Sequence, residues 1–390
     1  MTAAAFPFVK VDIDTSGLQP TAERSPGVIA IVGKALPSAN AGGADPNTPY
    51  VIATLDDAKA LFAKVDGDGN LQTTTIYDSI ELAFLQDPQP SKIYAVQVQG
   101  TNYAAALTAL EARDDVTMVS LANEYDPGAT GSPPTNLQAL KAHVEDMSSQ
   151  GKKRIGVAMI DPTRVRSATY ATDAYNAVAD LKSGDGRMVM MAARGSTQDV
   201  ATAAMAAIAG YEPQVSMVLK PIRGITMPQT SQYGPGEITA LTDDDNNINP
   251  VIDPDLIVGT NLYFAEDRTF TGDASRQYID IVRVLDDIDF RLKAGLIGAI
   301  GDSRITLRGL TSVKLRTQGI LEPLRENAVI DAYDISIPVL DILSVPDSAR
   351  SPGDTNTVTT ARADRAVDMY VSITYGPAVH YLHVTLKPSF

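Results

Sequence analysis

The first strongly apolar segment of the chain is framed by residues that could bind a phosphate. Gly27 and Gly33-Lys34 flank Val28–Val32, close to the loop in which backbone N–H groups and a lysine hold the phosphates of a nucleotide. The spacing does not fit, because five residues separate the glycines where the motif needs four, and Ala35 replaces the magnesium-binding hydroxyl. The apolar residues between the glycines also favour a strand over a loop. We therefore expect no nucleotide site here.

Two acidic segments could hold a cation. Asp66–Asn70 resembles the opening of a calcium-binding loop, but Leu71 stands at the glycine position and Tyr77 at the position of the bidentate glutamate. The run Asp243–Asp245, followed by two asparagines, offers oxygen ligands without such a spacing. Solvated turns are the favoured interpretation of both segments. A weak cation site at Asp243–Asp245 is the alternative.

Candidates for catalysis are few. The chain has no cysteine and three histidines, which are His143, His380 and His383. Because side chains alternate along a strand, His380 and His383 would lie on opposite faces and would not readily share a metal. The sequence has no Gly-x-Ser-x-Gly elbow, and Gly301–Ser303 lacks the companion motifs of an esterase. We therefore predict no catalytic residue, no metal site and no cofactor.

The composition is that of a globular protein. The 390 residues are 44% hydrophobic and 20% charged, and this length favours roughly two to three domains. A net charge of −15 argues against a surface that binds duplex nucleic acid. No stretch reaches the roughly 18 apolar residues of a membrane span, and the first ten residues lack a signal-peptide pattern. We expect a soluble protein made in a cytoplasm, with no nucleic acid and no direct membrane insertion.

Residues 27–100 predict an N-terminal β/α domain. Val28–Val32 and Ile93–Val98 have the continuous apolar character of buried strands, and a further strand is expected at Tyr50–Ala53. Two helices are expected between these strands, one ending near Phe62 and one at residues 75–86. Thr54 is a suitable N-cap for the first of them.

Helices and strands alternate from residue 101 to residue 220. This alternation is typical of a parallel sheet with helices on both faces, and Val215–Leu219 is the last strand that we expect in it. Residues 221–260 are rich in Pro, Gly, Asp and Asn. They predict an irregular connection with short strands such as Ile238–Leu241 and Leu256–Val258.

Residues 261–377 contain the clearest amphipathic helix, at Ser275–Gly295. Later in this segment we expect a helix at Thr311–Gly319, a strand at Val329–Ile337, a polar loop at Ser351–Thr357 and a strand from Val367 to Tyr375. One face of the first helix carries an apolar stripe at helical spacing, broadened by Val282 and formed by Tyr278, Ile281, Leu285, Ile288 and Leu292. Its opposite face is charged and consists of Arg276, Asp280, Arg283, Asp287 and Arg291.

Both ends of the chain look like strands without a sheet of their own, in residues 1–26 and 378–390. The N-terminal arm carries Phe6, Phe8, Val11 and Ile13, and the C-terminal arm carries Val379, Tyr381, Leu382, Val384 and Leu386. A strand satisfies its backbone groups only by pairing. The partners are therefore either edges of the chain's own sheets or the sheets of other subunits, reached by strand addition.

The order of these parts resembles the tail sheath proteins of contractile bacteriophages and of related particles such as R-type pyocins. Three segments carry the resemblance: Pro26–Gly33 with Pro49–Ile52 and Lys92–Val98; Lys153–Pro162; and Asp255–Phe264 leading through Arg268-Thr269-Phe270 into Tyr278–Val284. Sheath proteins commonly have an Arg-Thr pair before a long helix with a Val-Arg-Arg core. In this chain Arg268-Thr269 matches the pair, while Arg283 alone matches the core.

The resemblance implies an α/β fold with an inner domain and an inserted outer domain. An α+β inner domain, built from residues 261–377 with the N-terminal strands, would face a tail tube through the charged helix, and the α/β domain of residues 101–220 would be an outer insertion. The extended N- and C-terminal arms would pair with neighbouring copies in stacked rings or a helical sheath. Further implied partners are the tail tube, baseplate and tail terminator proteins, in a virion assembled in the host cytoplasm.

Two other functions remain open at this point. The alternating helices and strands are also those of a doubly wound α/β enzyme or ligand-binding protein, which would form a small closed oligomer. A sheath-like structural protein that does not contract is the second alternative. The sheath is the favoured interpretation, because the order of the parts resembles that of sheath proteins and the chain offers few candidates for catalysis.

Overall fold

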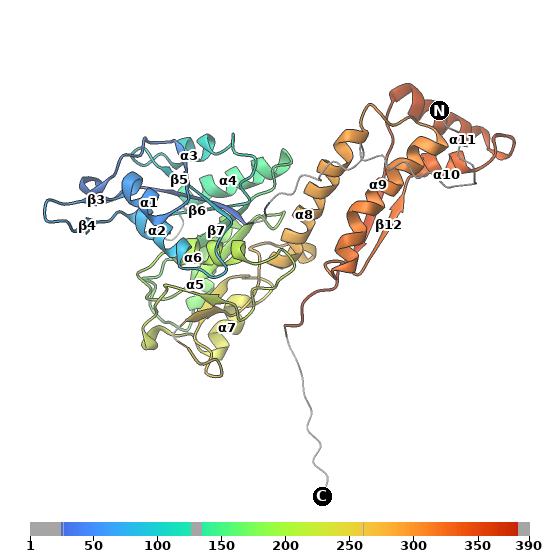
Figure 1. Ribbon diagram of the computed structural model, residues 1–390. Coiled ribbons are helices and arrows are strands. Elements are labelled where there is room, and N and C mark those ends of the chain that lie inside the picture. The colour runs from blue at the N-terminus through green and yellow to red at the C-terminus, as the bar shows by residue number, and fades with distance from the viewer. Residues whose placement is uncertain (1–24, 26, 126–134, 260, 381–390) are drawn as a thin grey trace, which may run out of the picture. The chain divides into compact units, whose positions relative to one another are not determined.

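The computed structural model describes residue 25 and residues 27–125, 135–259 and 261–380 (Figure 1). The described chain divides into two compact units. The first, which we call the sheet unit, contains the described residues up to Asp287 together with residues 328–331 and 374–380. The second, which we call the helical unit, contains residues 288–327 and 332–373. Of the arms expected at residues 1–26 and 378–390, only residue 25 and residues 378–380 are among the described residues.

A nine-stranded, mostly parallel sheet forms the centre of the sheet unit. Its order is β2-β5-β1-β6-β7-β8-β10-β11-β9, and the strands from β5 to β10 in this order run parallel, while β2, β11 and β9 are antiparallel to their neighbours. The strands are β1 (Val28–Gly33), β2 (Pro49–Ile52), β5 (Lys92–Gln97), β6 (Met118–Leu121), β7 (Ile155–Met159), β8 (Met188–Ala192), β9 (Pro221–Ile222), β10 (Asn249–Ile252) and β11 (Leu262–Phe264). A separate hairpin consists of β3 (Lys64–Val65) and β4 (Leu71–Gln72).

Helices cover both faces of this sheet, as the alternation predicts. α1 (Leu55–Phe62), α2 (Thr75–Phe84) and α6 (Val200–Gly210) contribute to the core on one face, and α3 (Tyr103–Ala109), α4 (Thr135–Ser149) and α5 (Tyr170–Val178) to the core on the other. Thr54 caps α1, accepting the Asp57 N–H while the Asp57 carboxylate accepts the Thr54 N–H. The predicted N-cap is confirmed.

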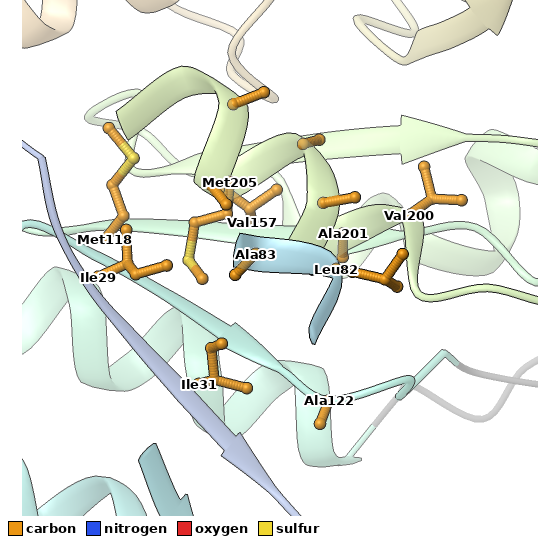
Figure 2. Packing of buried hydrophobic residues seen from close by; sticks show 14 of the residues in the cluster. Ile29, Ile31, Leu82, Ala83, Met118, Ala122, Val157, Val200, Ala201 and Met205 are labelled. Carbon is orange, nitrogen blue, oxygen red and sulfur yellow. The ribbon is translucent and has the colours of Figure 1, made fainter. Parts of the chain in front are cut away.

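The central strands are buried on both sides, which explains why they are apolar throughout. Ile29 and Ile31 of β1 lie in the first core, whereas Val28, Ala30 and Val32 lie in the second. Figure 2 shows Ile29 and Ile31 near Met118, Val157 and the small residues of α6. Alanines dominate α6, so that helix can lie close to the sheet.

One sheet joins strands from both sides of Gly100. β1 pairs with β5 on one side and with β6 on the other, so the expected boundary at Gly100 falls inside one sheet. The strand expected at Val215–Leu219 is wrong, because these residues form turns and irregular backbone. β9, which begins two residues later, forms the edge of the sheet instead.

Residues 221–260 are less irregular than predicted. Ile238–Leu241 lies in α7 (Pro235–Thr242) and not in a strand, since Pro235 and the N-terminal contact of Glu237 with the Gly234 N–H start a helix. The strand expected at Leu256–Val258 is also wrong. Leu256 is 97% exposed and lies in a turn between β10 and β11.

The helical unit contains the second half of α8 and the elements that follow it. α8 (Ile279–Leu296) begins in the sheet unit, and its residues from Ile288 onward belong to the helical unit. The further elements are α9 (Leu307–Glu326), β12 (Ala332–Ser336), α10 (Pro338–Ser344), α11 (Pro352–Asp364) and β13 (Tyr370–Thr374). α10 packs against both α9 and α11.

α11 corrects the loop expected at Ser351–Thr357. Ser351 accepts the Asp354 N–H, the Asp354 carboxylate accepts the Ser351 N–H, and Pro352 occupies the first helical position. The spacing Ser351-Pro-Gly-Asp354 is thus a start signal for a helix. The polarity of the residues that follow reflects exposure of the helix and not a loop.

Candidate functional site

The predicted arm residues are almost all beyond the described part of the chain. Phe6, Phe8, Val11, Ile13, Tyr381, Leu382, Val384 and Leu386 lie outside the described residues. Val379 is described and is 80% exposed. Inter-subunit pairing of the arms therefore stays a prediction.

The helical unit contains a small sheet that could receive added strands. β12 and β13 form a two-stranded sheet, and in β13 Tyr370, Ser372 and Thr374 are exposed while Val371 and Ile373 are half-buried. Each strand of such a pair leaves the N–H and C=O groups of its outer edge unpaired by the other strand. A further strand could therefore be added at either outer edge of the pair.

The charged face predicted on α8 is interrupted by burial. Asp280 is 2% exposed and Arg283 is 4% exposed, so these two side chains do not form a solvated surface together with Arg276, Asp287 and Arg291. The apolar stripe is buried in part, since Val282 and Ile288 are buried while Leu285 is exposed. Ile279, which was not predicted in the stripe, also enters the core.

Arg283 is held inside the sheet unit by backbone oxygens. Its Nη2 donates to the Tyr211 carbonyl at 2.6 Å and its Nη1 to the Glu212 carbonyl at 3.3 Å. Burial lowers the pKa of Arg283 to about 10, with the nearby charges of Asp267 and Glu212 opposing that effect. Arg283 therefore remains a cation and ties the first turns of α8 to the segment after α6.

Two buried aspartates accompany this arginine. Asp267 is fully buried, and its Oδ2 accepts the Met217 N–H at 3.1 Å. Its Oδ1 has no hydrogen-bond partner among the described residues. Burial, followed by the charge of Asp280, raises the pKa of Asp267 well above its usual range. The site can thus hold a proton on a carboxyl group in its interior.

The C-terminal segment of the described chain contacts this cluster. Tyr375 donates its hydroxyl hydrogen to Asp280 Oδ2 at 2.6 Å. His380 Nε2 lies 3.0 Å from Ser216 Oγ, and His380 Nδ1 lies 3.6 Å from Glu266 Oε2. The His380 ring also meets the Tyr278 ring edge to face, with centroids 5.2 Å apart. We call Ser216, Glu266, Asp267, Tyr278 and Asp280, with Tyr375 and His380, the polar anchor.

The Arg268-Thr269 pair of the sequence motif orders this region. Asn249 on β10 accepts the Arg268 N–H and donates to its carbonyl, and Thr269 donates its hydroxyl hydrogen to the Arg276 carbonyl. The Arg268 guanidinium lies over the Tyr278 ring and pairs with Asp244 at 2.8 Å. The motif therefore fixes the backbone that carries Glu266 and Asp267. Its contact with Asp244 also gives part of the acidic run a partner within the chain.

The other polar groups predicted from sequence have structural contacts. Lys34 follows strand β1 and pairs with Glu124 at 2.8 Å. Asp66 accepts the N–H groups of Asp68 and Asn70 in the turn between β3 and β4. The His143 ring contacts the Arg154 guanidinium inside the sheet unit, with His143 Nε2 2.7 Å from Arg154 Nη1.

A polar crevice of 360 Å³ lies where doubly wound folds bind ligands, beyond the carboxyl ends of parallel strands. Its most buried acid, Asp199, accepts hydrogen bonds from Ser79 Oγ, the Asn123 N–H and the Thr202 N–H. Both carboxylate oxygens are thus used to hold the start of α6. Within the described ranges no three His, Asp or Glu side chains gather as metal ligands, and no described helix could span a membrane.

Comparison with known proteins identifies the fold. No protein-family model and no curated protein matches this chain. The chain is similar to the sheath protein of the anti-feeding prophage in its contracted helical sheath, with 13% identity over 99% of both chains and a TM-score of 0.64. It is also similar to a chain of the contracted PVC sheath complex of an extracellular contractile injection system, with 13% identity over 99% of this chain and 98% of that one and a TM-score of 0.69.

A third similar structure is the sheath tail protein of Desulfitobacterium hafniense, with 10% identity, 84% of this chain and 93% of that chain covered, and a TM-score of 0.57. The chain therefore has the fold of contractile sheath proteins, and the resemblance noted in the sequence is confirmed at the level of the fold. The match extends over both units and not over the sheet unit alone.

Sequence reasoning missed most of the polar anchor. Ser216, Glu266, Asp267 and Tyr375 were not among the predicted site residues, while Asp280 was expected on a solvated face. One signal was present, since Glu266-Asp267 directly precedes Arg268-Thr269. Acidic residues beside a motif that orders the backbone are candidates for a buried role.

Proposed function

We propose that this chain is the structural subunit of a contractile sheath, which polymerises around a tube and drives it by changing from an extended to a contracted arrangement. The observation that carries the proposal is the likeness of the whole chain to sheath proteins from two contracted assemblies. A binding protein or enzyme that had only a doubly wound sheet would match through that sheet alone. The helical unit would then have no counterpart.

The small sheet of the helical unit supports assembly by strand addition. Among the described residues β12 and β13 pair only with each other, and the sequence predicts a strand-like arm at each end of the chain. We infer that the arms of neighbouring copies extend this pair into a larger sheet. Because each copy gives its arms and receives those of others, the contact is head-to-tail and builds an open polymer.

The proposed mechanism depends on a rigid sheet unit and on arms that connect neighbouring copies. The sheet unit has two large buried cores, so it moves as a rigid body, while the arms keep neighbouring bodies connected as their surface contacts are exchanged. The energy for movement would be stored during assembly, and no cofactor is required. For the inner surface that faces the tube we retain the partly exposed residues Arg276, Asp287 and Arg291 of the predicted charged face.

The remaining partners follow from the place of a sheath in such particles. We propose contacts with a tail tube protein, with a baseplate at one end and with a terminator protein at the other. A similar fold occurs in the baseplate structure of the anti-feeding prophage, where it covers 100% of both chains with a TM-score of 0.64. The assembled protein would be part of a phage-like or pyocin-like particle.

Electron microscopy of the purified chain and of two truncations tests this function. The full chain should form tubes or stacked rings, whereas deletion of residues 1–14 or of residues 381–390 should leave a folded monomer that forms neither. The C-terminal truncation ends after His380 and so retains the polar anchor. A small closed oligomer of the full chain would support a doubly wound enzyme or binding protein instead. Unchanged tubes in both truncations would contradict assembly through the arms.

A further inference from the structure

The polar anchor places several charged side chains in the interior of the sheet unit. Asp267 and Asp280 lie with Arg283 in the interior, and Glu266 and His380 extend the group. Burying charged groups costs free energy unless each finds a partner. In this case two of the partners, Tyr375 and His380, come from a segment that is distant in sequence from the rest.

This segment is the start of the C-terminal arm. The chain leaves the helical unit after Ile373, the last residue of that unit, and Tyr375 contacts Asp280 only two residues later. Asp331, another residue of the sheet unit, donates its N–H to the Thr374 carbonyl at 2.8 Å. His380 then forms the second fixed point, immediately before the residues that we expect to exchange between copies.

Between the two fixed points the described part of the chain gives the segment no further hydrogen bond. Gly376, Pro377, Ala378 and Val379 are exposed and form no regular structure. Fixation of the segment therefore depends on two side chains, both of which meet polar or acidic groups of the sheet unit. Hydrogen bonds to charged groups in a buried setting are stronger than neutral ones at the surface.

We propose that the polar anchor is a docking site for the root of the C-terminal arm, and that it transfers tension on that arm to the sheet unit instead of to the two-stranded sheet β12–β13. This inference rests on the proposed sheath function for the origin of the tension. The docking itself is a property of the single chain. Tyr375 and His380 are the positioning residues, and Asp280, Glu266 and Ser216 receive them.

Cleavage by chymotrypsin after residue 375 tests whether the root of the C-terminal arm docks on the polar anchor. The full chain is used under conditions in which it stays monomeric. Tyr375→Phe keeps the cleavage site and removes only the hydroxyl group, and it is combined with His380→Ala. Because proteolysis follows the population of the open segment, we expect cleavage after residue 375 to be about tenfold faster in the double variant than in the wild type. Tyr370→Phe, on the exposed face of β13, is the matched control and should leave that rate unchanged.

The unfolding midpoint of the sheet unit separates docking from general destabilisation. It should stay the same in the double variant, because the segment opens locally. Equal cleavage rates after Tyr370 and Tyr375 in the wild type would overturn the docking site. A faster cleavage that is accompanied by an equally lowered unfolding midpoint would also overturn it.

Electron microscopy of the assembled chains tests the transfer of tension. Wild-type tubes should survive shear through a narrow needle, whereas tubes of the double variant should break into pieces of less than half the length. Equal lengths after shear would overturn the transfer of tension. If the wild-type chain formed no tubes at all, the sheath function would fail, and the cleavage rates would still decide the docking site.

Discussion

The sheet unit and the helical unit differ in how far their strands are hydrogen-bonded to neighbouring strands and covered by other elements. In the sheet unit the central strands are hydrogen-bonded on both sides and covered on both faces. In the helical unit two strands form a sheet whose residues are largely exposed, and no further described strand pairs with them. Under the proposed function, the sheet unit keeps its shape during movement and the helical unit receives strands from other copies.

A substitution in each unit should separate stability from assembly. Ile31→Ala removes a fully buried side chain from the core of the sheet unit and should lower the free energy of unfolding by about 2–5 kcal/mol. Tyr370→Ala on β13 should change it by less than about 0.5 kcal/mol, yet shorten the tubes. Denaturant unfolding and electron microscopy measure the two effects. If Tyr370→Ala destabilised the monomer as much as Ile31→Ala, the proposed difference between the units would be wrong.

The buried pair of His143 and Arg154 should make the sheet unit sensitive to acid. Burial, and then the charge of Arg154, lowers the pKa of His143 from 6.5 to about 4. The folded state therefore binds this proton more weakly than the unfolded state does. The stabilisation is complete above pH 6.5 and declines as the pH falls to 4, by roughly 3 kcal/mol in total. His143→Gln keeps an acceptor for Arg154 and should remove this decline from the pH profile of unfolding.

The contribution of Asp267 to stability should depend on pH in the opposite direction to that of His143. Its raised pKa means that the folded state binds the proton more tightly, so its contribution to stability is present at low pH and is lost as the pH rises through the folded pKa. Asp267→Asn imitates the protonated acid and keeps an acceptor for the Met217 N–H. We expect it to be at least as stable as the wild type at neutral pH. Asp267→Ala should be less stable by about 1–3 kcal/mol, because the Met217 N–H loses its partner.

Helix caps allow a smaller test in each unit. Ser351→Ala in the helical unit and Thr54→Ala in the sheet unit each remove a side chain that accepts an N–H at the start of a helix. Each should cost about 1 kcal/mol. Hydrogen exchange should show that Ser351→Ala loosens α11 locally, while Thr54→Ala leaves the central strands protected. Equal loss of protection throughout the chain in both variants would contradict two separate units.

The sequence predicted the sheet unit better than the helical unit for a physical reason. Strands buried on both faces, such as Val28–Val32, have a continuous apolar pattern that needs no knowledge of their neighbours. The order of β1 between β5 and β6 depends on long-range pairing, which the local pattern around Gly100 does not contain. The polarity of Ser351–Thr357 favours a loop, whereas its capping signal starts a helix. The face of α8 was misjudged because charged residues are expected to be solvated, whereas Asp280 and Arg283 have partners inside the unit.

Disulfide formation between two single-cysteine variants tests the central claim, which is strand addition between copies of the chain. The natural sequence contains no cysteine, so Ser372→Cys on β13 and Val384→Cys in the C-terminal arm introduce the only thiols. In a mixture of the two variants a disulfide between these positions can join only different chains. We expect a cross-linked heterodimer when the mixture assembles and none when residues 1–14 are also deleted to prevent assembly. A cross-link that forms only within one chain, in the variant with both cysteines, would contradict it.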